Sequence, residues 1–208
     1  MHALDRFIPG ADFKTRQELL VDAPPATVFR AARSFELQSI AAVRGIFRLR
    51  EVLLHAKHTD LPRKGLVDQM IDIGWGILLE EPGRLLIAGA VCQPWRADVV
   101  FRSVPADEFA RYSEPFRVKI AWTLETVPCG PGSCRLVTET RAAGTDDRAR
   151  AVFHRYHEMF GMGIVAIRWL VLRSVRRQAE QVVFSRQVRS ATARDEFGTD
   201  QIEAIGHH

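Results

Sequence analysis

Cysteine is scarce in this chain of 208 residues, which has three: Cys92, Cys129 and Cys134. An odd cysteine count, together with an amino terminus that lacks the pattern of a secretory signal, predicts a cytoplasmic protein with free thiols. Cys129 and Cys134 flank the turn sequence GPGS, so a bridge between them stays open. No further cysteine pair could complete a four-ligand zinc site, and no metal is expected.

Long apolar runs and catalytic signature motifs are missing too. The most apolar window, Met162 to Leu172, is interrupted by Arg168 and is far shorter than the ~20 residues that span a bilayer, which predicts a buried helix. The chain has no dense Lys/Arg run interleaved with aromatic residues, so no nucleic-acid partner is expected. It has no GxSxG, glycine-rich phosphate loop or dinucleotide fingerprint, and no cofactor is expected. The net charge of +4 permits contact with an anionic ligand or a membrane surface.

The pattern that is present begins with a strand and helices and continues with a run of strands. Pro24 and Pro25 suit the opening turn of a first helix, and a second, more broken helix is predicted over residues 37–54. Residues 116–127 alternate between apolar and polar side chains, which is typical of a strand with one face on the core and the other in water. Pro82 and Gly83 predict a type II turn. The predicted strands are 13–21, 67–80, 85–92, 95–104, a short piece around Phe109, 116–127 and 134–143.

A long amphipathic helix comes last. Thr145 is its predicted N-cap, and apolar residues keep helical spacing to about Val183. A sheet with one apolar face needs a cover, and this helix is the only predicted element long enough to provide it. We therefore expect an α+β fold, with a curved antiparallel sheet wrapped around a long C-terminal helix and two shorter helices after the first strand. One domain over residues 1–184 would precede a polar, flexible tail over 185–208, in which the native origin of His207-His208 stays open.

Several segments resemble the START-like superfamily, also called SRPBCC or helix-grip, which includes birch-pollen-allergen-like proteins, lipid-transfer domains and aromatase/cyclases. The segments are ELLVDAPPATVFRAARSF, AWTLETV, CRLVTETRAAGTDDRARAVFHRYHEMFG and IRWLVLRSVRRQAE, and the resemblance covers about residues 12–183. Within the superfamily the chain is similar to an uncharacterised bacterial group, whose members often carry a bulky aromatic residue at the position of His157. The resemblance implies a deep cavity for an apolar or amphipathic ligand, and it does not imply one reaction.

The sequence HRYHE, residues 154–158, leaves three interpretations open. His154, His157 and Glu158 are three or four residues apart on one helix, so they could converge on a metal, although a third strong ligand would have to come from elsewhere. A histidine in a cavity could also transfer protons near neutral pH. In the simplest interpretation, His157 is a hydrogen-bonded residue of the cavity wall.

Glu139 and Arg141 lie two residues apart on the last predicted strand and therefore point to the same face of the sheet. Facing inward, they would form a buried pair and an anchor for a polar ligand head, since burying such charges unpaired is costly. Facing outward, they would be an ordinary solvated pair. The pattern does not decide between the two, and the resemblance favours the inward placement.

These observations predict a protein that binds a hydrophobic or amphipathic small molecule, such as a lipid, polyketide or isoprenoid, between sheet and helix. The alternative is a polyketide cyclase/dehydrase-like enzyme that uses His157, Tyr156 or Glu139 as acid or base. A third interpretation is an adaptor whose basic helix end, Arg173, Arg176 and Arg177, meets a partner; a homodimer and peripheral membrane contact also stay open. The predicted pocket residues are Trp75, Trp122, Glu139, Arg141, Phe153, Tyr156, His157, Phe160 and Ile164.

Overall fold

The computed structural model describes residues 3–36 and 64–203. The second helix predicted over residues 37–54 lies outside the described residues. The first predicted helix is confirmed as α1, Pro25–Arg33, with a proline at its first position. The strand predicted over residues 67–80 is wrong in its first half: Leu66–Asp72 forms the short helix α3, and the strand begins only at Gly76, after the positive φ of 105° at Gly74 turns the chain.

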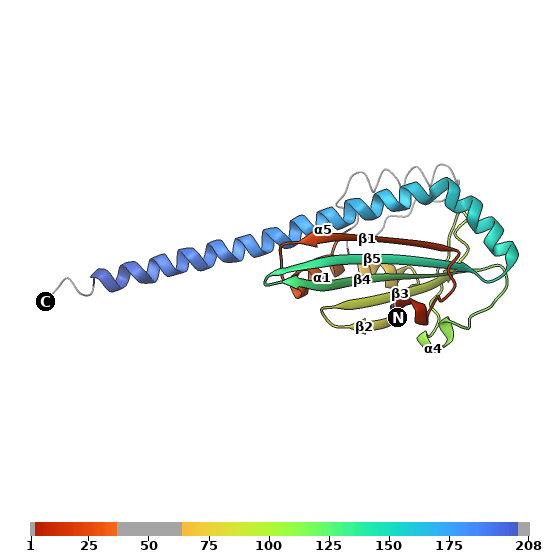
Figure 1. Cartoon of the computed structure of the whole chain (residues 1–208), viewed down its shortest axis with the longest axis horizontal. Coiled ribbons are helices and arrows are strands. Elements are labelled where there is room, and N and C mark those ends of the chain that lie inside the picture. The colour runs from red at the N-terminus through yellow and green to blue at the C-terminus, as the bar shows by residue number, and fades with distance from the viewer. Residues whose placement is uncertain (1–2, 37–63, 204–208) are drawn as a thin grey trace.

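Five antiparallel strands form one sheet in the order β1-β5-β4-β3-β2 (Figure 1). The β2–β3 turn follows the prediction: Gly83 has a φ of 74° and the Arg84 N–H donates to the Glu81 carbonyl at 3.1 Å. Because β1 is an edge strand of this sheet, as is β2, an element that lies beside the sheet can contact it. The strands are β1 Phe13–Val21, β2 Gly76–Glu81, β3 Leu85–Cys92, β4 Val118–Gly130 and β5 Ser133–Gly144.

The last helix, α5, spans Asp147–Glu203 and packs on one face of the sheet. The core on this face joins Leu172 and Val175 of α5 to Leu136 and Leu124 of the sheet. The expected arrangement of a sheet covered by a long C-terminal helix is therefore confirmed. Figure 1 shows α5 running along β1 and continuing far beyond the strands.

The two ends of α5 differ from the prediction. Asp146 is the capping residue: its carboxylate accepts from the backbone N–H groups of Ala149 at 2.7 Å and Phe116 at 2.6 Å, while the Thr145 hydroxyl bonds to the backbone of Arg117. The helix does not end near Val183, because helical backbone continues to Glu203. Residues 185–203 thus continue the helix, within the span 185–208 for which a flexible tail was predicted.

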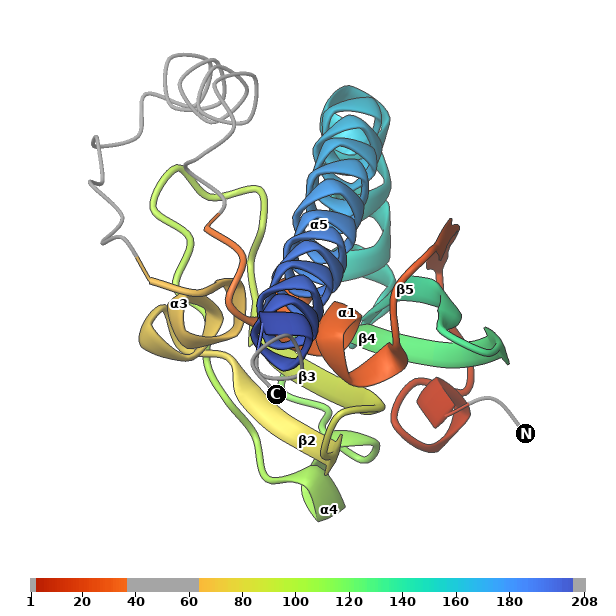
Figure 2. The ribbon, with the colours of Figure 1, turned by 90° about the vertical axis from the view of Figure 1, so that its left-hand side faces the viewer.

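The alternating strand pattern predicted that the opposite face of the sheet lies in water. This prediction is wrong, because that face is covered. The short helices η1, Ala3–Arg6, and α4, Ala106–Phe109, cover it with a second core. Strand β3 is buried along its whole length because both of its faces are covered. Seen along the helix in Figure 2, α5 lies on one side of the sheet, with η1 and α4 on the other. The core residues of this second face include Leu4, Phe7, Ile8, Ile87, Phe109 and Ala121.

Candidate functional site

An open groove runs between the edge strand β1 and helix α5, with a volume of about 650 Å³. Its walls are almost entirely apolar. Alternation along β1 brings Phe13 and Gln17 to the side that faces α5, and both are half-buried there. The α5 wall is made of residues spaced three or four apart, so they share one side of the helix. The lining residues are Phe13, Gln17, His157, Gly161, Met162, Val165, Ala166, Trp169 and Leu170.

His157 lines this groove with its ring tilted against that of Phe13, at 3.9 Å between ring centroids. A Cβ atom at Gly161 would come within 2.7 Å of the His157 ring, so the glycine makes room for the imidazole. The Nε2 atom is buried and has no hydrogen-bond partner among the described residues. Desolvation by burial, with a smaller contribution from His154, lowers the pKa of His157 and keeps the ring neutral at pH 7.

Gln17 supplies a second polar atom to the groove. Its amide nitrogen donates to the Val165 carbonyl at 3.3 Å. Its Oε1 atom is buried and lacks a partner within the described part of the chain. Buried polar atoms are almost always hydrogen-bonded in native proteins, so two such atoms in an apolar groove mark places where a bound molecule could supply the missing partner.

The other members of HRYHE point elsewhere. His154 Nδ1 lies 3.3 Å from Glu158 Oε1, and both side chains are exposed. His157 faces Phe13, so the three side chains do not converge. Over residues 3–36 and 64–203, no group of three His, Cys, Asp or Glu side chains is placed to hold a metal ion.

Six other predicted pocket residues lie on the α5 side of the sheet or on α5 but do not line this groove. Trp75 and Trp122 are half-buried against the core that α5 covers. Phe153 and Tyr156 stack at 6.4 Å between ring centroids, and Phe160 lies 5.0 Å from Tyr156. Ile164 is half-buried. Of the nine predicted residues, His157 is the one that the groove contains.

Glu139 and Arg141 require a correction. They are buried, at 0% and 4% exposure, but on the face of the sheet opposite α5. Arg141 donates from Nε to Glu139 at 2.7 Å and from Nη1 to Asp5 at 2.6 Å and to the Ile8 carbonyl at 3.1 Å. The pair joins the amino-terminal segment to the sheet and cannot anchor a ligand beneath the helix. The sequence pattern left the face of this pair open and the resemblance favoured the cavity side; the covering by η1 was not expected.

Sequence reasoning missed most of the groove. Phe13 and Gln17 occupy alternate positions of the first predicted strand, and that alternation was the available signal for a shared face. Met162 is 84% exposed and Trp169 47% exposed, which is unusual for large apolar side chains on a helix that covers a sheet. Their seven-residue spacing places them on one side of α5, away from its buried stripe.

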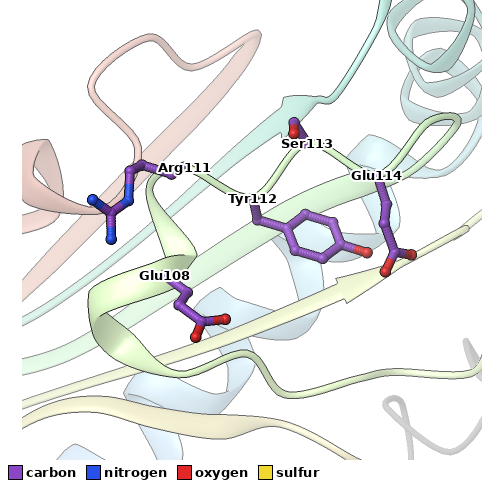
Figure 3. Close-up of a pocket in the computed structure, with 5 residues that line it drawn as sticks. All are labelled: Glu108, Arg111, Tyr112, Ser113 and Glu114. Atoms are coloured by element: carbon purple, nitrogen blue, oxygen red, sulfur yellow. The ribbon is translucent and has the colours of Figure 1, made fainter.

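A second, smaller hollow of about 360 Å³ lies near α4 and is lined by Glu108, Arg111, Tyr112, Ser113 and Glu114 (Figure 3). In Figure 3, Arg111 points away from Tyr112 and Glu114. Arg102 pairs with Glu114 at 2.6 Å and with the Tyr112 hydroxyl. Hydrogen bonds from Arg102 and Tyr112 lower the pKa of Glu114. The Glu114 carboxylate at this hollow is therefore already paired within the protein.

The three cysteines are free thiols in the structure. Cys129 is exposed at the hairpin tip, whereas Cys134 is buried. Burial raises the pKa of Cys134 to about 11, so this thiol is a poor nucleophile at neutral pH.

Comparison with known proteins gives structural neighbours only, since no family model and no curated protein matches the chain. Truncated norcoclaurine synthase from Thalictrum flavum has 12% identity and a TM-score of 0.38, with 82% of this chain and 92% of that chain covered. The di-domain ARO/CYC BexL of the BE-7585A pathway has 14% identity and a TM-score of 0.35, with 82% and 47% covered. A hypothetical protein from Helicobacter pylori has 11% identity and a TM-score of 0.32, with 85% and 90% covered.

The chain has the helix-grip fold. This assignment rests on its own five-stranded antiparallel sheet and on the long helix across it. The sheet and the covering C-terminal helix that the resemblance implied are present in the structure. Among the described helices, none combines the length and the apolar character that crossing a bilayer requires.

Proposed function

We propose that this protein binds a hydrophobic or amphipathic small molecule in the groove between β1 and α5. The observation that carries the proposal is the groove itself: a volume of about 650 Å³ with apolar walls and two buried polar atoms without described partners, Gln17 Oε1 and His157 Nε2. Small-molecule sites in proteins are typically ~300–1,000 Å³, mostly apolar, with a few polar groups that fix orientation.

The energetics favour a ligand with a substantial apolar part. Each CH₂ group removed from water contributes about 0.8 kcal/mol, so a chain of several carbons in this groove gains several kcal/mol without any polar contact. Burial of Met162 and Trp169 adds to the free energy of binding, because the ligand covers apolar surface that is exposed in the free protein. Lipids, polyketides and isoprenoid-like molecules meet this description.

The test introduces a charge into the groove. Ala166 is exposed and lines the groove, whereas Ala151 is exposed on the same helix outside it. We expect Ala166→Glu to weaken binding of the uncharged apolar dye Nile red at least tenfold, because a bound apolar molecule would desolvate the new carboxylate. Ala151→Glu makes the same change of charge and should leave the affinity unchanged.

Fluorescence titration with Nile red measures both affinities, and displacement by 1-dodecanol confirms that the dye occupies a site for apolar chains. Absence of dye binding by the wild-type chain, or equal losses in the two variants, would contradict the proposal. Thermal unfolding of each variant checks that the fold is kept.

A second candidate function is a cyclase/dehydrase-type enzyme acting in the same groove. The observation that favours it is His157 in the lining of the groove, with a neutral ring and a buried Nε2 that has no partner among the described residues, since a general base must be unprotonated. Conversion of a poly-β-keto thioester to a cyclised product by the purified protein would support this candidate. Binding of such a substrate without conversion would favour the binding role alone.

A further inference from the structure

A polar patch interrupts the apolar face that the sheet turns toward α5. Thr15 of β1 is paired in register with Thr140 of β5, and Gln17 is paired with Thr138. Alternation places all four side chains on the face covered by α5. Further along the same strands this face is apolar, with Leu19 and its partner on β5 in the core. Four polar side chains therefore lie together on a face of the sheet that is otherwise apolar.

Arg168 of α5 reaches down onto this patch. Its guanidinium donates to the Thr140 hydroxyl and, at 3.3 Å, to the Thr15 carbonyl. It forms no salt bridge with any described carboxylate, and Glu139, the nearest acidic influence, belongs to the opposite face of the sheet. Burial lowers the pKa of Arg168 to about 10. A cation held away from water without a counterion is costly, so an anion at this place would offset the cost.

Thr138 contributes a further polar atom to this patch. Its side chain is 3% exposed and its hydroxyl has no hydrogen-bond partner among the described residues. The Thr138 hydroxyl can donate to an anionic oxygen, and the Thr140 hydroxyl, which accepts from Arg168, still has its own hydrogen to donate. A guanidinium and two hydroxyls in one patch are the donor set that carboxylates and phosphates accept from.

We propose that Arg168, Thr138 and Thr140 bind the anionic head group, a carboxylate or a phosphate, of an amphiphile whose apolar chain lies in the groove between β1 and α5. This inference rests on the proposed binding function and names the chemical class of its ligand. The two sites adjoin: Thr15, whose carbonyl holds the guanidinium, lies between Phe13 and Gln17, which line the groove. Gln17 also stands directly across from Thr138.

The experiment compares three ligands with the same twelve-carbon chain at pH 8, by displacement of Nile red. We expect dodecanoate and dodecyl phosphate to bind the wild-type protein at least tenfold more tightly than 1-dodecanol. Arg168→Met should abolish this preference while leaving the affinity for 1-dodecanol unchanged. Arg177→Met, which removes an exposed arginine of the same helix, should keep the preference.

A measurement with inorganic phosphate distinguishes a site for the head group of an amphiphile from a site for a free anion. We expect it to leave the unfolding midpoint unchanged at concentrations where dodecyl phosphate raises it. An equal rise with inorganic phosphate would show a site for a free anion and would overturn the amphiphile proposal.

A structural role of Arg168 predicts different results. If the residue only supports the fold, Arg168→Met should lower the unfolding midpoint and weaken the binding of all three ligands equally. Under our proposal the midpoint of the free protein does not fall, because the substitution removes an uncompensated buried charge. Should this variant not fold, Thr138→Val carries the test with the same expected loss of preference. Binding of 1-dodecanol with no preference for the anions overturns this inference and leaves the proposed function standing, whereas no binding of any ligand overturns both.

Discussion

His157 is held by its neighbours in a position that favours the neutral ring. Phe13 covers one side of the imidazole at 3.9 Å, and Gly161 leaves the space that the ring occupies. On the same helix, His154 lowers the pKa of His157 and Glu158 raises it, but desolvation is the largest cause and the net direction is downward. An aromatic residue at this position would pack equally well; the histidine adds a ring nitrogen that can accept a proton or a hydrogen bond.

This lowered pKa makes a prediction about stability. Because the folded protein holds a proton on His157 less tightly than the unfolded chain does, the contribution of the neutral ring to stability is fully present above the unfolded pKa of about 6.5 and is lost as the pH falls toward the folded pKa. We expect the free energy of unfolding to fall less between pH 7 and pH 5 in His157→Gln than in the wild type. Urea unfolding of both proteins at both pH values measures the difference.

At the scale of single elements, periodicity predicted most of the sheet and the course of α5. Strand β3 was predicted with its observed bounds, because the turn at Pro82 and Gly83 marks its start and Pro94 follows its end. The short helix α3 was missed, since seven residues are too few for a helical period to be distinguished from an apolar strand. The groove was missed for another reason: it lies between β1 and α5, and a period read along one element does not reveal how two elements meet.

The same limit explains the misplacement of Glu139 and Arg141. The two-residue period correctly placed both side chains on one face of β5, but which face lies under α5 depends on the register of β5 with its neighbours β1 and β4. The face that received them is covered by η1, a four-residue helix with no sequence signal of its own. The buried ion pair of Glu139 and Arg141 thus helps to attach the amino-terminal segment to the sheet.

We expect Arg141→Met to destabilise the fold by about 3–5 kcal/mol, because it leaves Glu139 buried without its closest partner. Lys14 and Arg16, each 3.6 Å from Glu139, are the remaining partners and keep the loss toward the lower end of that range. Replacing both residues, Glu139→Leu with Arg141→Met, should recover part of the stability, since no charge then stays buried. Chemical denaturation measures all three proteins. A loss below about 1 kcal/mol in the single variant would contradict the buried placement.

At the scale of the whole molecule, α5 has two parts, one that packs against the domain and one that projects from it. As far as Ala179 and Glu180 it belongs to the domain: Ala179 is fully buried, and the Glu180 carboxylate accepts from the backbone N–H of Asp22 at 3.2 Å. Beyond that point the described side chains are mostly exposed, including Phe184 at 68% and Val188 at 47%. The free energy of folding should therefore depend on the helix up to about residue 183 and little on the part that projects.

Two truncations test this division. A chain that ends after Arg189 keeps every contact that the described side chains of α5 make with the sheet, and it should unfold within about 0.5 kcal/mol of the full chain, because a helical extension contributes little on its own. A chain that ends after Gln178 loses the buried Ala179 and the bond from Glu180 to Asp22, and we expect it to be less stable by about 1–3 kcal/mol. Urea unfolding followed by tryptophan fluorescence compares the three chains, since all four tryptophans are retained. Equal losses in both truncations would mean that the projecting part of α5 supports the domain through contacts that its exposed side chains do not suggest.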